Sequence, residues 1–285
     1  MTPPAQLASF LAQKFVKTPV PDLVQLCRDL GLRVREVPAN GFDGALVRSK
    51  AGQKGIIAVN SRLREASRKR FTIAHEIGHY VIPHHRLLGN VCDERQIERF
   101  ETRLNRPEVE ANEFAAELLL PSAVLRKRFD LSALSLNQIS TVASEFGTSL
   151  TATTRSFLSL TNLPCALVWS AGQRARWCAR SDSFQFFLPL EELPADGSFA
   201  AGLFSGNPAP DDFAPVASDL WLDAKAAERV ETLLEHSVRL PTYDAVLTLL
   251  WAFKMATAPH DSGQDELLEE LDPSDFTLGR RRWPL

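Results

Sequence analysis

The chain has few cysteines, no long apolar run and no excess of one charge. Four cysteines are spread over 285 residues without a CxxC pair, which excludes a disulfide-rich secreted scaffold and indicates thiols in a reducing compartment. The longest apolar stretch, residues 245–253, is far shorter than the roughly 20 residues of a membrane-spanning helix. The first residues lack a basic segment followed by an apolar run, so no signal peptide is expected. These absences predict a soluble, cytoplasmic protein without membrane contact.

The charge balance is nearly even. The sequence has 32 Lys and Arg residues against 35 Asp and Glu residues, a net charge of -3. Contacts from Lys and Arg to phosphates dominate nucleic-acid binding, and the whole chain lacks the basic composition that this requires. Hydrophobic residues make up 45 % and charged residues 24 %, which is typical of a globular protein. At roughly 150 residues per domain, the length indicates about two domains.

Residues 1–162 are predicted to form a mainly helical domain with a small sheet. Pro83 and Pro121 end two of its helices and Pro107 begins one, because proline lacks an N–H and has a fixed φ. Helices are predicted at residues 5–16, 21–31, 61–82, 107–120, 122–129 and 135–160, and strands at 32–37, 44–49 and 55–60, the last two joined by a KAGQ turn. The strand at 55–60 is either an ordinary hairpin strand or an edge strand that pairs with an extended substrate.

The character of the sequence changes at Pro164, and a second, α/β domain is predicted over residues 163–259. Strands are predicted at 165–171, 175–181, 184–190, 220–223 and 243–253, a long loop at 194–218 and a helix at 225–236. Five aromatic residues are expected in its sheet core, with a ligand-sensing pocket as the alternative: Trp169, Trp177, Phe184, Phe186 and Phe187. Residues 260–285 hold seven acidic residues and read as a solvated acidic tail.

The most informative segment is FTIAHEIGHYVIPHH, residues 71–85. It places His75 and His79 four residues apart, so that both imidazoles lie on one face of a helix and can bind one metal ion. Glu76 lies beside them, where its carboxylate can act as a base on water at the metal. The surrounding apolar and small residues indicate a buried helix, in which two facing histidines without a partner would be costly. The pattern therefore predicts a metal site.

The third protein ligand is open between two kinds of residue. His85 has the spacing of an HExxHxxGxxH motif, but Ile82 stands where that motif has the glycine that permits the turn. On the helix after Pro107, Glu108 and Asn112 lie on one face, so Glu108 could bind the metal while Asn112 orients a histidine ligand. The other glutamates of that helix are expected away from the metal or in solvent: Glu110, Glu113 and Glu117. We favour Glu108 as the third ligand.

These motifs resemble the ImmA/IrrE family of regulatory metallopeptidases. The segments KRFTIAHEIGH and EVEANEFAAELLLP are similar to that family's two signature helices, and the likeness covers residues 30–160. The resemblance implies an α+β fold with a zincin-like peptidase domain of the gluzincin kind, whose glutamate ligand maps onto Glu108. It also implies cleavage of a helix-turn-helix repressor that controls stress-response or mobile-element genes. The C-terminal part resembles, more weakly, the sensor-like domains of some members.

The expected chemistry is metal-assisted peptide hydrolysis. Zn²⁺ suits two histidines and one carboxylate, although Mn²⁺ or Fe²⁺ could also occupy the site. The metal polarises the scissile carbonyl, and Glu76 takes a proton from water and passes it to the leaving amine. The sequence does not choose an oxyanion donor among Tyr80, His84 and His85.

Two other features allow a different function. Residues 135–160 have the apolar spacing of a helix-turn-helix with Phe146–Gly147 at the turn, but Arg155 is their only basic residue, so packing is expected rather than direct DNA binding. A basic cluster is either a solvated helix face or a docking surface for an acidic partner or for the tail: Arg62, Arg64, Arg68, Lys69 and Arg70. The alternative function is a ligand-sensing or DNA-binding regulator with a structural or vestigial metal site. Glu76 argues against it, because a structural site needs no base.

Overall fold

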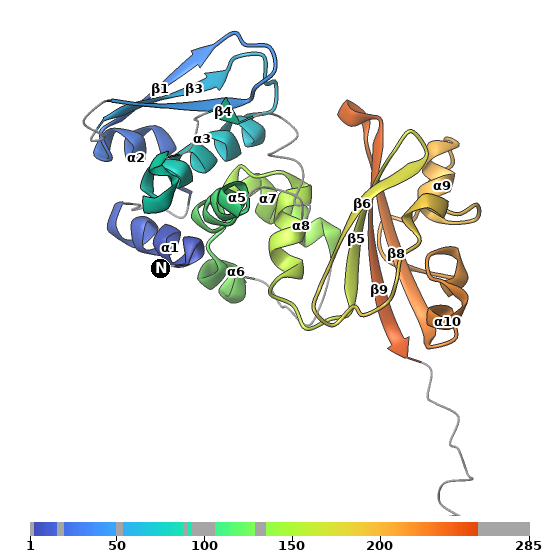
Figure 1. Cartoon of the computed structure of the whole chain (residues 1–285). Coiled ribbons are helices and arrows are strands. Elements are labelled where there is room, and N and C mark those ends of the chain that lie inside the picture. Colours follow the sequence, from blue (N-terminus) through green and yellow to red (C-terminus); the bar gives the residue numbers. More distant parts are fainter. Residues whose placement is uncertain are drawn as a thin grey trace, which may run out of the picture.

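A computed structural model describes residues 3–15, 20–49, 54–87, 91–92, 106–128 and 135–255 of the chain. The fold is α+β, with one sheet and its helices in the N-terminal part and a second sheet in the C-terminal part (Figure 1). The predicted turn at residues 50–53 and the acidic tail at 260–285 lie outside the described residues. Among the described helices, none has the length and apolar character needed to cross a membrane.

The N-terminal part confirms the predicted small sheet beside helices. Its elements are α1 (Pro4–Phe15), α2 (Leu23–Asp29), β1 (Leu32–Val37), β2 (Gly44–Arg48), β3 (Gly55–Asn60), α3 (Ala66–Val81), the 3₁₀ helix η1 (Pro83–Leu87), β4 (Val91–Cys92) and α5 (Arg106–Leu119). The strand order is β1-β3-β2-β4, with β1 parallel and β2 antiparallel to β3. Because β3 lies between β1 and β2, the expectation that residues 55–60 form an edge strand is wrong.

One apolar core joins this sheet to the helices below it (Figure 1). Its buried side chains include Leu11 of α1, Leu26 of α2, Ile57 of β3, Ile77 of α3 and Phe114 of α5. The helices α3 and α5 are amphipathic, and each places its apolar stripe in this core. The core therefore fixes α3 against β2 and against α5, and the two helices carry the predicted metal ligands.

The C-terminal part is a five-stranded antiparallel sheet in the order β6-β5-β9-β8-β7. Its elements are β5 (Cys165–Ala171), β6 (Arg174–Arg180), η2 (Leu190–Glu192), α9 (Phe199–Phe204), β7 (Ala214–Val216), η3 (Ser218–Leu220), α10 (Ala224–Ala227), β8 (Val230–Leu240), η4 (Pro241–Tyr243) and β9 (Ala245–Met255). The predicted loop at 194–218 contains α9 and β7.

Three secondary-structure predictions in this part are wrong. Residues 184–190 and 220–223 form no strand, and the predicted helix at 225–236 is the short α10 followed by β8. The Glu- and Leu-rich segment that begins β8 has ordinary helix propensity, but β8 pairs with β9 along almost its whole length. Strand pairing and burial outweigh a local helix preference of a few tenths of a kcal/mol per residue.

The helices α6 (Ser122–Arg128), α7 (Leu136–Phe146) and α8 (Leu150–Leu158) pack on one face of the second sheet. Phe146 and Phe157 share a buried cluster with Leu167 of β5 and Leu249 of β9. The predicted helix-turn-helix forms, and Gly147 ends α7 in the left-handed region at φ 62°. Its apolar face packs on the second sheet, whereas packing within the peptidase domain was expected.

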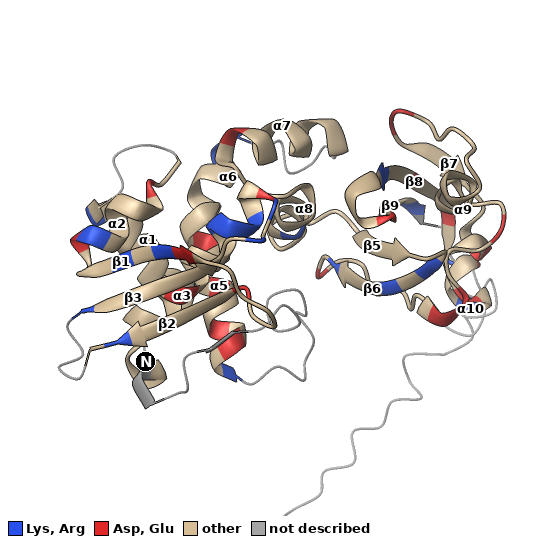
Figure 2. Cartoon of the chain, turned by 90° about the horizontal axis from the view of Figure 1, so that it is seen from above, with Lys and Arg blue, Asp and Glu red and all other residues tan. Residues whose placement is uncertain are grey.

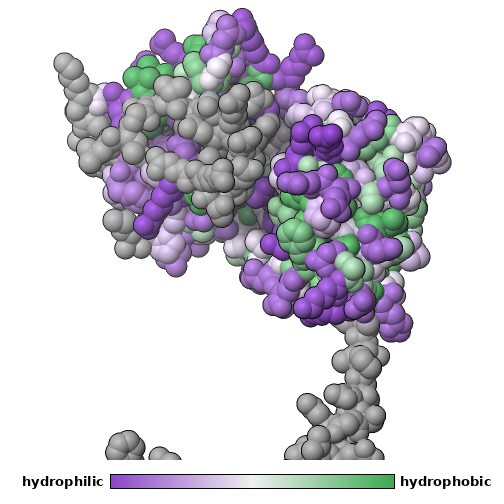
Figure 3. Space-filling view, turned by 45° about the vertical axis from the view of Figure 1, so that its right-hand side comes forward, coloured by the Kyte–Doolittle hydropathy of each residue, from purple (hydrophilic) through white to green (hydrophobic). Residues whose placement is uncertain are grey.

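The aromatic residues of the C-terminal part divide between the two faces of the sheet. Trp169 and Trp177 stack with ring centroids 6.2 Å apart on the face that meets α7 and α8. Phe184 and Phe186 are buried on the opposite face, whereas Phe187 is 61 % exposed, so its prediction as a core residue is wrong. Elsewhere on this part, hydrophobic residues reach the surface in small patches among hydrophilic ones (Figure 3).

The basic cluster before and within α3 is largely paired inside the chain. Arg68 bonds Asp43 at 2.8 Å, Lys69 bonds Glu36 at 2.7 Å, and Arg62 bonds Asn40. Basic and acidic residues are interspersed over the part of the chain drawn in Figure 2. Most of these cations therefore neutralise or cap neighbouring groups of the same domain.

Candidate metal centre

The helix α3 presents the HExxH residues on its buried face. His75 and Glu76 are fully buried, and His79 is nearly so. The guanidinium of Arg48 on β2 donates to the carbonyl oxygens of His79 and Tyr80, the latter at 3.2 Å. It thereby caps the C-terminal end of α3, where the free carbonyls and the helix dipole favour a cation. The helix is thus held at the turn that carries its last functional residue.

The structure brings Glu108 of α5 to the two histidines of α3. The Nε2 atoms of His75 and His79 are 3.0 Å apart. The Glu108 carboxylate lies 3.2 Å from Nε2 of His75 and 3.4 Å from Nε2 of His79. Burial alone would raise the pKa of Glu108, but the hydrogen bonds and charges of the two histidines hold it well below its usual range. Two imidazoles and one carboxylate therefore converge on one point.

Asn112, one turn after Glu108, fixes the orientation of His75. Its Oδ1 lies 2.9 Å from Nδ1 of His75, and both side chains are fully buried. Because an amide oxygen only accepts, Nδ1 of His75 carries the proton and Nε2 keeps its lone pair. That lone pair points at Nε2 of His79 and at Glu108. Acceptor atoms packed this closely can hold a cation between them. Two nitrogen ligands and one oxygen ligand, with a further carboxylate nearby, are typical of zinc sites that leave one coordination position open for water.

Glu76 is seated by a close approach between β2 and α3 that sequence reasoning missed. A Cβ atom on Gly44 of β2 would lie 2.8 Å from Oε1 of Glu76 and 2.4 Å from Cγ2 of Thr72. Ordinary contacts between such atoms are about 3.5–4.0 Å. Only glycine allows the strand to pass this close to the carboxylate. The sequence signal for this close approach was the glycine that begins the strand GALVR, where the other positions carry side chains.

Gly78, inside the HExxH motif, has a comparable role between α3 and α5. A Cβ atom there would lie 3.0 Å from Cδ1 of Phe114 and 3.3 Å from Cα of Ala111. The missing side chain lets the two helices approach until Glu108 reaches the histidines. The glycine of the motif thus contributes to the site through helix packing.

The three candidate hydrogen-bond donors to the oxyanion lie in different surroundings. Tyr80 is half-buried, and its ring lies 5.0 Å from the guanidinium carbon of Arg48. His84 is partly exposed and bonds Glu110. His85 is buried, with Nδ1 3.1 Å from Nδ1 of His79 and Nε2 3.0 Å from Oε2 of Glu110. Both ring nitrogens of His85 already have partners, one in His79 and one in Glu110. His85 is therefore placed neither to bind the metal with His75, His79 and Glu108 nor to donate to a substrate oxyanion.

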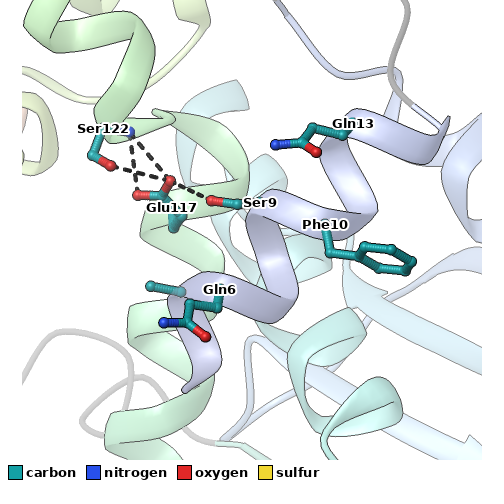
Figure 4. Close-up of a pocket in the computed structure, with 7 residues that line it drawn as sticks. Gln6, Ser9, Phe10, Gln13, Glu117 and Ser122 are labelled. Carbon is teal, nitrogen blue, oxygen red and sulfur yellow. Dashed lines mark hydrogen bonds between the residues drawn. The ribbon is translucent and has the colours of Figure 1, made fainter. Parts of the chain in front are cut away.

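Among the remaining glutamates of α5, the position of Glu117 differs from expectation. Glu113 is exposed as predicted. Glu110 is buried, and hydrogen bonds from His85, Arg106 and His84 outweigh its burial and lower its pKa. Glu117 is half-buried and accepts from Ser9 at 2.7 Å and from the backbone N–H of Ser122, so its expected solvent position is wrong. It lines a shallow pocket between α1 and α5, where it caps the start of α6 (Figure 4).

Comparisons with known proteins identify this part of the chain. Residues 27–156 match the Peptidase_M78 family model, described as the IrrE N-terminal-like domain. A solved structure described as a Mycobacterium tuberculosis transcriptional regulator is 12% identical, with a TM-score of 0.51 over 87% of this chain and 74% of that one. Identity this low shows a shared fold alone. No curated protein matches the chain. Residues 27–156 therefore match the IrrE N-terminal-like domain, which confirms the resemblance of this part of the chain to the ImmA/IrrE family.

Proposed function

We propose that the chain is a metal-dependent endopeptidase in which His75, His79 and Glu108 bind Zn²⁺ and Glu76 is the general base. The observation that carries the proposal is the convergence of two Nε2 atoms and one carboxylate within 3.0–3.4 Å of one another. A second group with atoms that could bind a metal ion consists of His84, His85 and Glu110. There, however, the cation of Arg106 already lies 2.9 Å from the carboxylate of Glu110.

Each side chain of the site has a separate role in the proposed hydrolysis. When bound, Zn²⁺ polarises the scissile carbonyl and lowers the pKa of water. Glu76 takes the proton of the attacking water and returns it to the leaving amine, a role worth roughly 10²–10⁴-fold in rate. Asn112 keeps the proton of His75 on Nδ1. Gly44 leaves the space in which the carboxylate of Glu76 sits.

The substrate that we propose is a helix-turn-helix repressor, whose cleavage would relieve repression of stress-response or mobile-element genes. The support is the IrrE N-terminal-like domain together with the resemblance of the motifs to the ImmA/IrrE family. The description of the structural neighbour as a transcriptional regulator agrees with such a setting. We assign catalysis to residues 1–162 and substrate recognition or signal sensing to residues 163–259.

The direct test compares the wild-type chain with Glu76→Gln. Both proteins, loaded with Zn²⁺, are incubated with a proteome-derived peptide library and with the helix-turn-helix proteins encoded near the gene, and new N-termini are identified by mass spectrometry. We expect cleavage by the wild type and a loss of about 10²-fold or more in Glu76→Gln at unchanged metal content. Glu113→Gln, an exposed carboxylate on α5, is the matched control and keeps full activity. Equal cleavage by wild type and Glu76→Gln would refute the proposal.

A further inference from the structure

A second polar cluster borders the proposed metal centre and has no part in the chemistry above. His84 and His85 lie on η1, directly after α3, and both rings reach the Oε2 atom of Glu110 on α5. Glu110 and His85 are buried, and Arg106 bonds the other carboxylate oxygen of Glu110 at 2.9 Å. Burying this many polar groups beside a metal centre is costly unless they are fully hydrogen-bonded.

The ring nitrogens of His85 lead from Glu110 to a proposed metal ligand. Nε2 of His85 lies 3.0 Å from Oε2 of Glu110, and Nδ1 of His85 lies 3.1 Å from Nδ1 of His79. A carboxylate only accepts, so the proton of a neutral His85 is on Nε2 and its Nδ1 accepts. His79 must then donate from Nδ1, which leaves the lone pair of its Nε2 directed at His75 and Glu108.

We propose that Glu110 and His85 form a hydrogen-bonded relay that fixes the tautomer and ring orientation of His79 as a metal ligand. This inference rests on the proposed function. Asn112 gives His75 the same support from the other side of the site. The helix α5 thus supplies one ligand, Glu108, and supports both histidine ligands, one directly and one through His85.

The break in α3 makes this contact possible. On a continuous helix, a residue six positions after His79 would point to a different face. Pro83 cannot continue the hydrogen bonding of α3, and η1 begins there. The backbone N–H of His85 bonds the carbonyl of Ile82 at 3.2 Å, and this turn brings its ring back under His79. The ring centroids of His79 and His85 are 4.9 Å apart.

The test measures zinc affinity, which reports on ligand orientation whether or not the substrate is known. Zn²⁺ affinity is determined by chelator competition for the full chain and for His85→Leu, His85→Asn, Glu110→Ala and His84→Leu. Support of a histidine ligand by a hydrogen-bond partner is typically worth 10–100-fold, so we expect losses of about that size in His85→Leu and Glu110→Ala. His85→Asn is expected to stay within about threefold of wild type, because its amide oxygen can accept from Nδ1 of His79.

His84→Leu is the matched control, because His84 bonds the same carboxylate as His85, whereas the contact with Nδ1 of His79 is made by His85. It is expected to keep wild-type affinity. Thermal melting of the metal-free variants identifies any that fail to fold. An independent measurement on the zinc-loaded wild type uses ¹⁵N-labelled histidine, and NMR is expected to place the proton of His79 on Nδ1 and that of His85 on Nε2.

The outcomes separate this inference from the proposed function. Wild-type affinity in folded His85→Leu, or a proton on Nδ1 of His85, would overturn the relay and leave the peptidase proposal intact. Two zinc ions per wild-type chain, with one lost in His85→Leu, would make the cluster a second metal site and also overturn the relay. A wild type that binds no metal would instead overturn the proposed function.

Discussion

The contact between Gly44 and Glu76 leads to the sharpest prediction about catalysis. Replacing Gly44 by Ala adds one methyl group 2.4 Å from Cγ2 of Thr72 and 2.8 Å from Oε1 of Glu76. Both distances are more than half an ångström short of an ordinary contact of about 3.5–4.0 Å. Overpacking of this kind typically costs about 1–3 kcal/mol of folding free energy. Displacing a catalytic group by about 1 Å can cost on the order of 10²-fold in rate.

Two measurements separate the effect on stability from that on catalysis. We expect Gly44→Ala to lower the free energy of unfolding by about 1–3 kcal/mol in denaturant titrations, and to reduce kcat/KM by on the order of 10²-fold at unchanged zinc content. Adding Thr72→Ala removes the closer of the two overlaps, so the double variant should regain much of the stability. It should remain slow, because the new methyl group still lies against Glu76.

The control is Gly202→Ala on α9, where a new Cβ would have its nearest neighbour at 3.6 Å. That substitution is expected to leave stability unchanged or slightly raised, since alanine restricts the unfolded chain. Full activity and wild-type stability in Gly44→Ala would refute the argument that β2 holds the base in place. Recovery of activity in the double variant would show that Glu76 itself is not displaced.

Three further predictions follow from burial and from the shared core. Glu108→Ala is expected to lose zinc while Glu113→Ala retains it, measured by elemental analysis of dialysed protein; retention in both would remove Glu108 from the ligand set. Burial raises the pKa of Cys27 to about 12 and that of Cys165 further, so at pH 8 only about one Cys27 in 10⁴ is the reactive thiolate. Mass spectrometry should find both thiols unlabelled by maleimide until denaturant is added, and rapid native labelling would contradict this. A chain truncated after residue 162 is expected to aggregate, because the apolar faces of α7 and α8 lose their sheet; a soluble monomer in light scattering would contradict the shared core.

The sequence predicted the parts of the site that depend on helix periodicity. The spacing of His75 and His79, and that of Glu108 and Asn112, each require only that their segment be helical, and both segments are strongly amphipathic. The structure then places the two pairs together. Pro83 and Pro121, which follow α3 and α5, also marked the ends of these two helices.

The features that sequence reasoning missed depend on contacts between distant segments. The contact of Glu110 with His85 requires the chain to reverse after Pro83, and the space beside Glu76 requires β2 to cross α3. The false helix at residues 225–236 has the same origin, because β8 forms only where β9 pairs with it. Local propensity contains no information on a partner strand many residues away.

Anomalous scattering at the zinc edge, from crystals of the zinc-loaded chain, tests most directly whether His75, His79 and Glu108 hold one zinc ion. We predict a single strong peak about 2.0–2.2 Å from Nε2 of each histidine and from the Glu108 carboxylate. No peak at that point, or a peak held instead by His84, His85 and Glu110, would contradict the account.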